Sequence, residues 1–248
     1  MLHHRLDGSG PPLVLLHPIG LDLTCWDGVV PSLAARFTVL RLDLPGHGGS
    51  PLPGPDHTLA DYAQDVAECL RDVVPGPAAV LGLSFGGMIA QTLAIHHPGL
   101  VAALIPCGCP SEFPAAARAA IAERGAAAER GGMAAVLDAT MERWFTPGFM
   151  NAPEAARVRQ VLLADDPRGW AIGWRAISRL DTSGGLGAVT APTCCIAGSA
   201  DAAVPPDATR RIAGHIPQAR FVELPGAPHM MHLEQPRAFS DAVLDFLK

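Results

Sequence analysis

The sequence predicts a doubly wound α/β domain, with a mostly parallel sheet and an inserted helical lid. Short apolar runs bounded by Gly, Pro or Asp recur along the 248 residues, and stretches with helical spacing separate them. Such alternation is typical of a parallel sheet covered by helices on both faces. Between residues 111 and 190 no strand pattern occurs, and only helical patterns remain.

Six apolar runs are expected to form strands buried on both faces, as in a parallel sheet. They lie at 13–17 (LVLLH), 37–43 (FTVLRLD), 78–84 (AAVLGLS), 101–107 (VAALIPC), 193–198 (TCCIAG) and 219–224 (ARFVEL). Two helical stretches accompany these strands, one within the series and one after it. One follows Thr58, which has capping-box spacing to Asp61. The other carries the apolar stripe of Phe239, Val243, Phe246 and Leu247 at the C-terminus.

The interval 111–190 is expected to be a helical lid on an α/β core made of residues 1–110 and 191–248. Its alanine-rich stretches are amphipathic, which favours folded helices over a disordered linker. Trp144, Trp170 and Trp174 lie in this interval, and Arg143 precedes Trp144. These residues predict a mostly apolar pocket with some cationic character, and Trp144, Trp170 and Arg143 are the candidate substrate-binding residues.

Charge and composition limit the partners. The net charge is −6, and no basic run exceeds the pair Arg210-Arg211, so we expect neither a nucleic acid nor an anionic membrane as partner. No apolar segment approaches the roughly 20 residues of a membrane span, and no signal-peptide pattern opens the chain, so we expect a cytoplasmic protein. The six cysteines include no C-x-x-C pair and are interpreted as core residues. No metal or organic cofactor is expected, and nothing in the sequence indicates an oligomeric state.

The segment Gly82-Leu83-Ser84-Phe85-Gly86 places a serine where a strand runs into a helix. At such a tight turn the hydroxyl projects above the sheet, and side chains at the two glycine positions would collide with the neighbouring strand and helix. The helix that begins near Phe85 directs its free N–H groups at the same point. Ser84 is therefore the candidate nucleophile.

A serine hydroxyl needs a base, and that base needs a carboxylate to orient it. Asp201 follows the strand predicted at 193–198, and His229 follows the one at 219–224, so both are expected at the same sheet edge as Ser84. The chain order Ser84, Asp201, His229 predicts a catalytic triad. His232 remains the rival base, three residues further on.

Two backbone N–H groups are predicted to hold the oxyanion of a reacting acyl group. One belongs to Phe85, at the start of the helix after Ser84. The other follows the first parallel strand in "LLHPIGLD", where Pro18 has no N–H, so that Ile19 becomes the donor. His17 is interpreted as a residue that shapes this loop, and the Phe85 side chain is expected to line the acyl pocket.

These motifs resemble the α/β-hydrolase superfamily over nearly the whole chain, through H-P-I-G, D-L-P-G-H-G-x-S, G-L-S-F-G-G, G-S-A-D and the P-H-x-x-x-L-E-x-P-like ending. Within it, the chain is most similar to the 3-oxoadipate enol-lactonases. That similarity is carried by GGMAAVLDATMERWFTPGF, VLLADDPRGWA, APTCCIAGSADAAVPP and ARFVELPGAPH. The resemblance implies the α/β-hydrolase fold and a substrate that carries a carboxylate, for which Arg143 is the candidate partner.

The chain also departs from the enol-lactonases. Their oxyanion loop resembles S-N-S-L-G, where this chain has L-H-P-I-G, and their D-T-R-G-H-G is here D-L-P-G-H-G. The arginine expected shortly after the GW segment falls on Ser178, with Arg179 next to it. These differences leave the fold and the triad intact, and they allow substrates other than the family's lactone.

The sequence therefore predicts a serine hydrolase of a small ester or lactone, working through an acyl-enzyme, with 3-oxoadipate enol-lactone as one candidate substrate. A general carboxylesterase, a carbon–carbon bond hydrolase and a cofactor-free perhydrolase use the same triad and remain alternatives. A non-enzymatic small-molecule receptor on the same fold is a further alternative, which a turnover assay separates from the enzymes.

Overall fold

A seven-stranded sheet forms the centre of the computed structural model, which describes residues 1–248. The strand order is β1-β3-β2-β4-β5-β6-β7, and every neighbouring pair is parallel except β1 with β3. The strands are β1 His4–Asp7, β2 Pro12–Leu16, β3 Thr38–Leu42, β4 Ala78–Leu83, β5 Val101–Cys107, β6 Cys194–Gly198 and β7 Arg220–Leu224. The predicted doubly wound, mostly parallel sheet is confirmed.

The two edges of the sheet differ from the expectation of strands buried on both faces. Strand β1 was not among the six predicted strands and pairs antiparallel with β3 at one edge. Strand β7 pairs only with β6, and four of its five residues are partly or fully exposed. An edge strand has a neighbour on one side only, so its side chains are less completely covered than those of the fully buried central strand β4.

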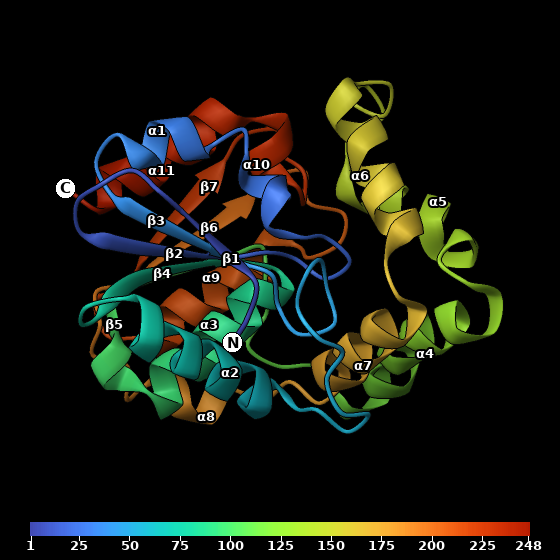
Figure 1. The fold of residues 1–248 in the computed structure, drawn as a ribbon, viewed down its shortest axis with the longest axis horizontal. Helices are drawn as coiled ribbons and strands as arrows, with labels where there is room; N and C mark the ends of the chain where they lie inside the picture. Colours follow the sequence, from blue (N-terminus) through green and yellow to red (C-terminus); the bar gives the residue numbers. More distant parts are fainter.

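Helices cover both faces of the sheet (Figure 1). Short α1 (Val30–Ala34) and α11 (Pro236–Phe246) cover one face, whereas α2 (Leu59–Val73), α3 (Phe85–His96), α8 (Ser183–Leu186) and α9 (Pro206–His215) lie on the other. The predicted capping box of α2 is confirmed, because Thr58 N–H donates to Asp61 Oδ2 (2.8 Å) and Asp61 N–H donates to Thr58 Oγ1 (3.2 Å). Shorter segments complete the order: η1 Leu23–Trp26, η2 Pro98–Leu100 and α10 Met231–Glu234.

Between β5 and β6 the chain leaves the sheet and forms a helical insertion, which lies beside the sheet in Figure 1. Its helices are α4 Ala115–Gly131, α5 Ala134–Trp144, α6 Pro153–Ala164 and α7 Pro167–Ser178. Helix α4 packs closely on α7, since a Cβ at Gly125 would lie 2.8 Å from the Cα atom of Ala171. The two ends of the insertion meet: Thr182 N–H donates to the Ser111 carbonyl (2.8 Å), and Glu112 and Asp181 form an antiparallel bridge.

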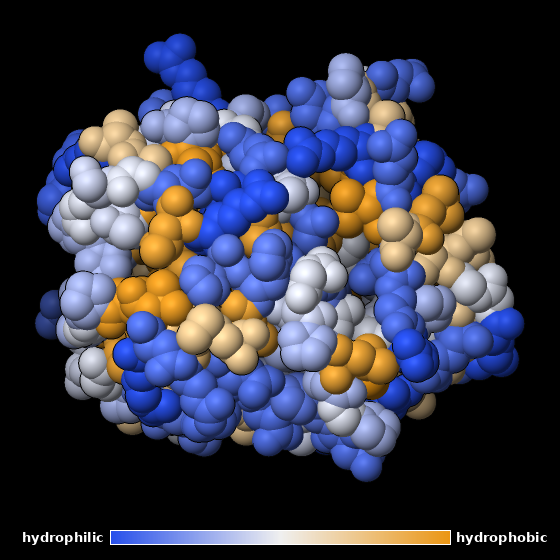
Figure 2. Space-filling model, viewed as in Figure 1, coloured by the Kyte–Doolittle hydropathy of each residue, from blue (hydrophilic) through white to orange (hydrophobic).

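Few large hydrophobic side chains are exposed on the surface. Met1, Leu6, Leu52 and Leu163 are the exposed ones, and on the face shown in Figure 2 apolar residues form separate groups among polar residues. Scattered exposed apolar residues of this kind are normal for a folded domain. None of the helices has both the length and the apolar character that crossing a membrane requires. All six cysteines are buried and unpaired, as the sequence predicted.

Candidate active site

Ser84 lies at the turn between β4 and α3, in a backbone conformation that side chains rarely adopt (φ 54°, ψ −113°). The two glycines of the motif permit this turn. A Cβ at Gly82 would lie 2.1 Å from the Gly86 carbonyl oxygen, and a Cβ at Gly86 would lie 2.1 Å from the Leu16 carbonyl oxygen. The first contact is with α3 and the second with β2, as the sequence predicted. The strained turn holds the Ser84 hydroxyl at the carboxyl edge of the sheet.

Two backbone N–H groups near Ser84 are free to donate. Phe85 is the first residue of α3, so its N–H has no acceptor within that helix. The N–H of Ile19, in the loop after β2, makes no hydrogen bond within the chain. The Phe85 side chain does not line the acyl pocket, and that expectation is wrong. It is fully buried and packs edge-on against the Tyr62 ring, with centroids 4.9 Å apart.

The loop that carries Ile19 is held in place by His17. Its Nε2 accepts a hydrogen bond from the Leu44 N–H (2.9 Å), so its Nδ1 carries the proton and donates to the Pro18 carbonyl (2.8 Å). Burial, followed by the neighbouring His47, lowers the pKa of His17 to about 4. The imidazole is therefore neutral at physiological pH and serves to shape the loop, in agreement with the interpretation of the sequence.

Asp201 and His229 are brought together at the same sheet edge. His229 Nδ1 lies 2.7 Å from Asp201 Oδ2, and both side chains are almost completely buried. The other carboxylate oxygen, Oδ1, accepts hydrogen bonds from the N–H groups of Ala203 (2.8 Å) and Val204 (2.7 Å). With Nδ1–H directed at Asp201, the Nε2 atom of His229 is left as an acceptor.

The Ser84 hydroxyl makes no hydrogen bond to His229, although both residues line one cavity. Such bonds are often long without substrate and tighten in the substrate complex. Gly108, just after β5, was not singled out from the sequence. Its φ is +49°, and a Cβ there would lie 3.4 Å from Asp201 Oδ2 and 3.5 Å from His229 Nδ1. Its position after a strand end in "CGC" was the available signal.

The cavity above Ser84 has a volume of about 370 Å³ and is lined mostly by apolar side chains. Ile19, Ser84 and His229 line it from the core, and the helical insertion supplies most of the remainder. The three candidate binding residues all contribute: Trp144, Trp170 and Arg143. Arg143 donates from Nη2 to the Ala203 carbonyl (3.2 Å), in the loop that also holds Asp201. A pocket of this size suits a small molecule.

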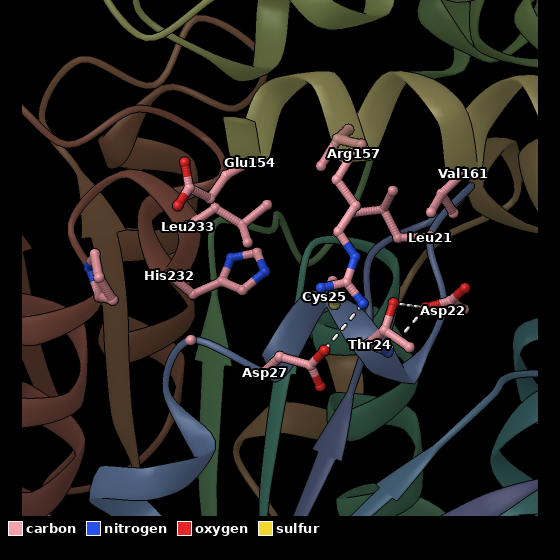
Figure 3. A pocket seen from close by; sticks show the side chains of 13 residues that line it. Leu21, Asp22, Thr24, Cys25, Asp27, Glu154, Arg157, Val161, His232 and Leu233 are labelled. Atoms are coloured by element: carbon pink, nitrogen blue, oxygen red, sulfur yellow. Dashed lines mark hydrogen bonds and ion pairs between the residues drawn. The ribbon is translucent and has the colours of Figure 1, made fainter. Parts of the chain in front are cut away.

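His232, the rival base, does not line the Ser84 cavity. It lines a separate cavity of about 320 Å³ between α6 and the η1 segment, where Arg157 pairs with Asp27 (3.0 Å) (Figure 3). Its ring lies 4.5 Å from that of Trp26, and neither ring nitrogen has a hydrogen-bond partner. Burial, followed by the charge of His229, lowers the pKa of His232 to about 3. The geometry therefore favours His229 over His232.

Two further residues of the Ser84 cavity were missed as site residues. Arg124 of α4 lines it, with its guanidinium 4.9 Å from the centre of the Trp174 ring, which lines it too. Trp174 was visible as a tryptophan of the predicted lid, but no pattern distinguished Arg124 from the other arginines of that interval. Arg179, next to the position where the enol-lactonases carry an arginine, lines a different cavity near α2. No group of three or more His, Cys, Asp or Glu side chains is placed to hold a metal ion.

Comparison with known proteins matches residues 13–242 to a family described as the alpha/beta hydrolase family. Among solved structures, the enol-lactonase of Burkholderia xenovorans LB400 aligns with a TM-score of 0.94 and 32% identity, over 99% of this chain and 96% of that one. A pimeloyl-[acyl-carrier protein] methyl ester esterase of Chromobacterium violaceum is 33% identical over 254 residues, which are 97% of this chain and 96% of the relative.

A third relative is 3-oxoadipate enol-lactonase 2 of Acinetobacter baylyi. It is 27% identical over 240 residues, which are 96% of this chain and 89% of the relative. The resemblance to enol-lactonases that the sequence motifs indicated is thus confirmed as a similarity. Because an esterase is as similar to this chain as the enol-lactonases are, the identities alone do not select one substrate.

Proposed function

The chain belongs to the alpha/beta hydrolase family, and from that premise we propose that it hydrolyses a small ester or lactone bearing a carboxylate. The observation that carries the proposal is the common cavity of Ser84, His229 and Ile19, with Asp201 bonded to the far side of the imidazole. This arrangement supplies a nucleophile, a base and an N–H donor around one small volume, which is what acyl transfer requires.

In the proposed reaction, the Ser84 hydroxyl attacks the acyl carbon while His229 Nε2 takes its proton. Asp201 stabilises the resulting imidazolium, and its own position is held by the N–H groups of Ala203 and Val204. His229 then protonates the leaving alcohol or enol oxygen, giving an acyl-enzyme. A water molecule, deprotonated by the same imidazole, releases the acid and restores the Ser84 hydroxyl.

The N–H groups of Ile19 and Phe85 are proposed to stabilise the negative oxygen of each tetrahedral intermediate. Both are unused by the chain itself, and both are backbone groups, so they need no rearrangement when charge develops. His17 contributes indirectly, because its two hydrogen bonds fix the loop in which Ile19 lies. The proposed mechanism thus uses residues of this chain, the substrate and one water molecule.

Arg143 is proposed to bind the substrate carboxylate. Its guanidinium has one hydrogen bond, to the Ala203 carbonyl, and no acidic partner, so donors remain for an anion. Trp144 and Trp170 supply apolar wall around it. The similarity to enol-lactonases supports an anionic lactone as substrate, whereas the position of Arg179 outside the cavity departs from that family's pattern.

A general carboxylesterase is the second candidate. Two observations favour it: the relative named a methyl ester esterase, and the L-H-P-I-G oxyanion loop, which differs from that of the enol-lactonases. A panel of anionic lactones, neutral lactones and methyl esters separates the candidates through kcat/KM. Carbon–carbon substrates and peracid formation belong in the same panel, because the same triad performs those reactions.

Ser84→Ala tests the proposal directly. We expect kcat to fall by about 10⁴-fold or more while substrate binding is largely kept, since only the nucleophile is lost. A fluorophosphonate should label wild type once, at Ser84, and should not label the variant. Ser183→Ala, in α8 outside the cavity, is the matched control and should behave as wild type. Labelling at any residue other than Ser84 would overturn the assignment.

A further inference from the structure

The Ser84 cavity contains more positive charge than a single carboxylate needs. Two arginines line it, Arg124 from α4 and Arg143 from α5, and neither forms an ion pair within the chain. The one acidic residue of the insertion that also lines it, Glu123, is paired with Arg130. On the core side, the carboxylate of Asp201 is already engaged by His229. Two guanidinium groups are therefore left without a counter-ion.

Arg124 is held in place by groups that leave its N–H donors unused. Its guanidinium lies 4.9 Å from the centre of the Trp174 ring, within the range of a cation–π contact. Its backbone carbonyl accepts the indole N–H of Trp170 (3.2 Å). An aromatic ring fixes the plane of a guanidinium without consuming hydrogen bonds, so all five donors remain available to an anion.

Two guanidinium groups that line one mostly apolar cavity repel each other unless an anion lies near them. Partial burial and the charge of Arg143 both lower the pKa of Arg124, although an arginine stays protonated at physiological pH. Each guanidinium would be stabilised by a carboxylate placed between or beside the two. The insertion places such charges on two successive helices, α4 and α5, which contact each other.

We propose that Arg124 anchors a second carboxylate, so that the substrate is an ester or lactone bearing two carboxylates, one bound by Arg143 and the other by Arg124. This inference rests on the proposed function for the identity of the reacting bond. The predicted binding of two carboxylates is independent of the proposed function, because the two arginines and Trp174 form the anion site whether or not Ser84 reacts. A monoanionic substrate would leave one guanidinium uncompensated.

The test measures binding in the Ser84→Ala protein, where no turnover occurs, by titration calorimetry at pH 7.5. Glutarate provides two carboxylates, and monomethyl glutarate provides one on the same carbon chain. We expect glutarate to bind about tenfold or more tightly, the contribution of one charge-assisted contact. Arg124→Met should remove this difference and leave the binding of the monomethyl ester within about threefold.

Two variants control for charge and folding. Arg118→Met removes an exposed arginine from the same helix, outside the cavity, and should keep the full preference for glutarate. Arg124→Lys keeps the positive charge and should retain part of the preference for glutarate. If the loss in Arg124→Met came from unfolding of α4 and not from the missing charge, Arg124→Lys would not retain it. Circular dichroism and thermal melting compare the folding of all variants.

The outcomes separate the inference from the proposed function. Equal affinity for glutarate and its monomethyl ester with Arg124 intact would overturn the inference even if wild type hydrolyses esters. A glutarate preference that survives Arg124→Met would overturn it as well. A preference that depends on Arg124, in a protein whose wild type hydrolyses no ester or lactone, would support the anion site and refute the proposed function.

Discussion

The sheet edge and the helical insertion form opposite walls of the Ser84 cavity and are built differently. At the sheet edge, backbone groups approach so closely that Gly82 and Gly86 admit no Cβ, and Asp201 accepts two backbone hydrogen bonds besides its contact with His229. On the insertion, the guanidinium of Arg124 rests on the Trp174 ring, and that of Arg143 makes one hydrogen bond, to the Ala203 carbonyl.

This difference indicates that the two regions have different roles in catalysis. The sheet edge can place reacting groups accurately because neighbouring backbone fixes them, which acyl transfer needs. The insertion presents apolar walls and charges that select a substrate by its size and charge. Substitutions at the sheet edge should therefore abolish turnover, whereas substitutions on the insertion should change which substrate is preferred.

The largest effect expected from this comparison separates two histidines of one segment. His229→Ala should lower kcat by about 10⁴-fold or more, because no base remains for Ser84. His232→Ala should keep kcat within a few fold and lower the free energy of unfolding by about 1–3 kcal/mol, since it leaves a void beside Trp26. Steady-state kinetics and urea unfolding on both variants provide the measurement. A nearly normal His229→Ala enzyme beside an inactive His232→Ala enzyme would reverse the assignment.

The next effect tests the close packing at the sheet edge. Gly86→Ala should lower the free energy of unfolding by about 3 kcal/mol or more, because its Cβ would lie 2.1 Å from the Leu16 carbonyl oxygen and the turn would have to move. Gly214→Ala, in α9 with no atom within 4 Å of its Cβ position, should instead raise it by up to about 1 kcal/mol. Equal responses in urea unfolding would show that the turn at Ser84 is less constrained than these distances imply.

A smaller effect is expected from the insertion. Arg143→Met should lower kcat/KM for an anionic lactone by about 10- to 150-fold, which corresponds to about 1.5–3 kcal/mol for a charged hydrogen bond. A neutral ester of similar size should be affected by less than about threefold. Equal losses on both substrates, or a wild-type preference for neutral esters, would favour the general carboxylesterase instead.

The smallest effect concerns the pH dependence of the free energy of unfolding, which is expected to have opposite signs in the two regions. Burial raises the pKa of Asp165, between α6 and α7, to about 7, so the folded chain holds a proton that the unfolded chain loses above about pH 4. Its stabilising contribution is present below that pH and is lost as the pH rises to 7. Asp165→Asn should therefore match wild type near pH 4 and exceed it in free energy of unfolding by about 1–2 kcal/mol at pH 8, since the residue as a whole is only partly buried.

The two core histidines contribute to the pH dependence of stability with the opposite sign. Burial lowers the pKa of His17 and His47 to about 4, below the value of about 6.5 in an unfolded chain. Their contribution is present above pH 6.5 and is lost as the pH falls toward 4. Urea unfolding of wild type and Asp165→Asn across pH 4 to 8 measures both trends. A difference between the two proteins that stays constant with pH would contradict the role given to Asp165.

The sequence predicted the sheet edge better than the insertion, for a physical reason. Strand ends and the Thr58–Asp61 cap follow from local contacts, and the glycines on either side of Ser84 belong to a short motif with a known turn geometry. The expectation that the alanine-rich stretch is amphipathic is wrong for helix α4. About half of its residues are alanine and its polar residues lie on all sides, so its spacing does not reveal the face that turns inward. For that reason Trp144 and Trp170 could be anticipated at the cavity, whereas Arg124 could not.

The exposure of β7 and the separate cavities of His229 and His232 could not be read from the sequence. Strand β7 was expected to be buried on both faces, although its sequence RFVEL carries two charged residues, Arg220 and Glu223, and both are exposed. Its place at the edge depends on the order of the strands in the sheet. His229 and His232 are separated by only three residues, yet the turn at α10 directs them into different cavities. Such outcomes depend on tertiary packing, which residue spacing along one segment does not determine.

The contact between the two ends of the insertion has an evolutionary consequence. Because Ser111 and Thr182 are joined by a hydrogen bond, the chain leaves the core and returns to it at nearly one point. A segment with matching ends can then be replaced or lengthened without moving the strands that carry Ser84, Asp201 and His229. Descendants of one ancestral gene can thus exchange α4 to α7 and acquire new substrates while inheriting the same chemistry unaltered.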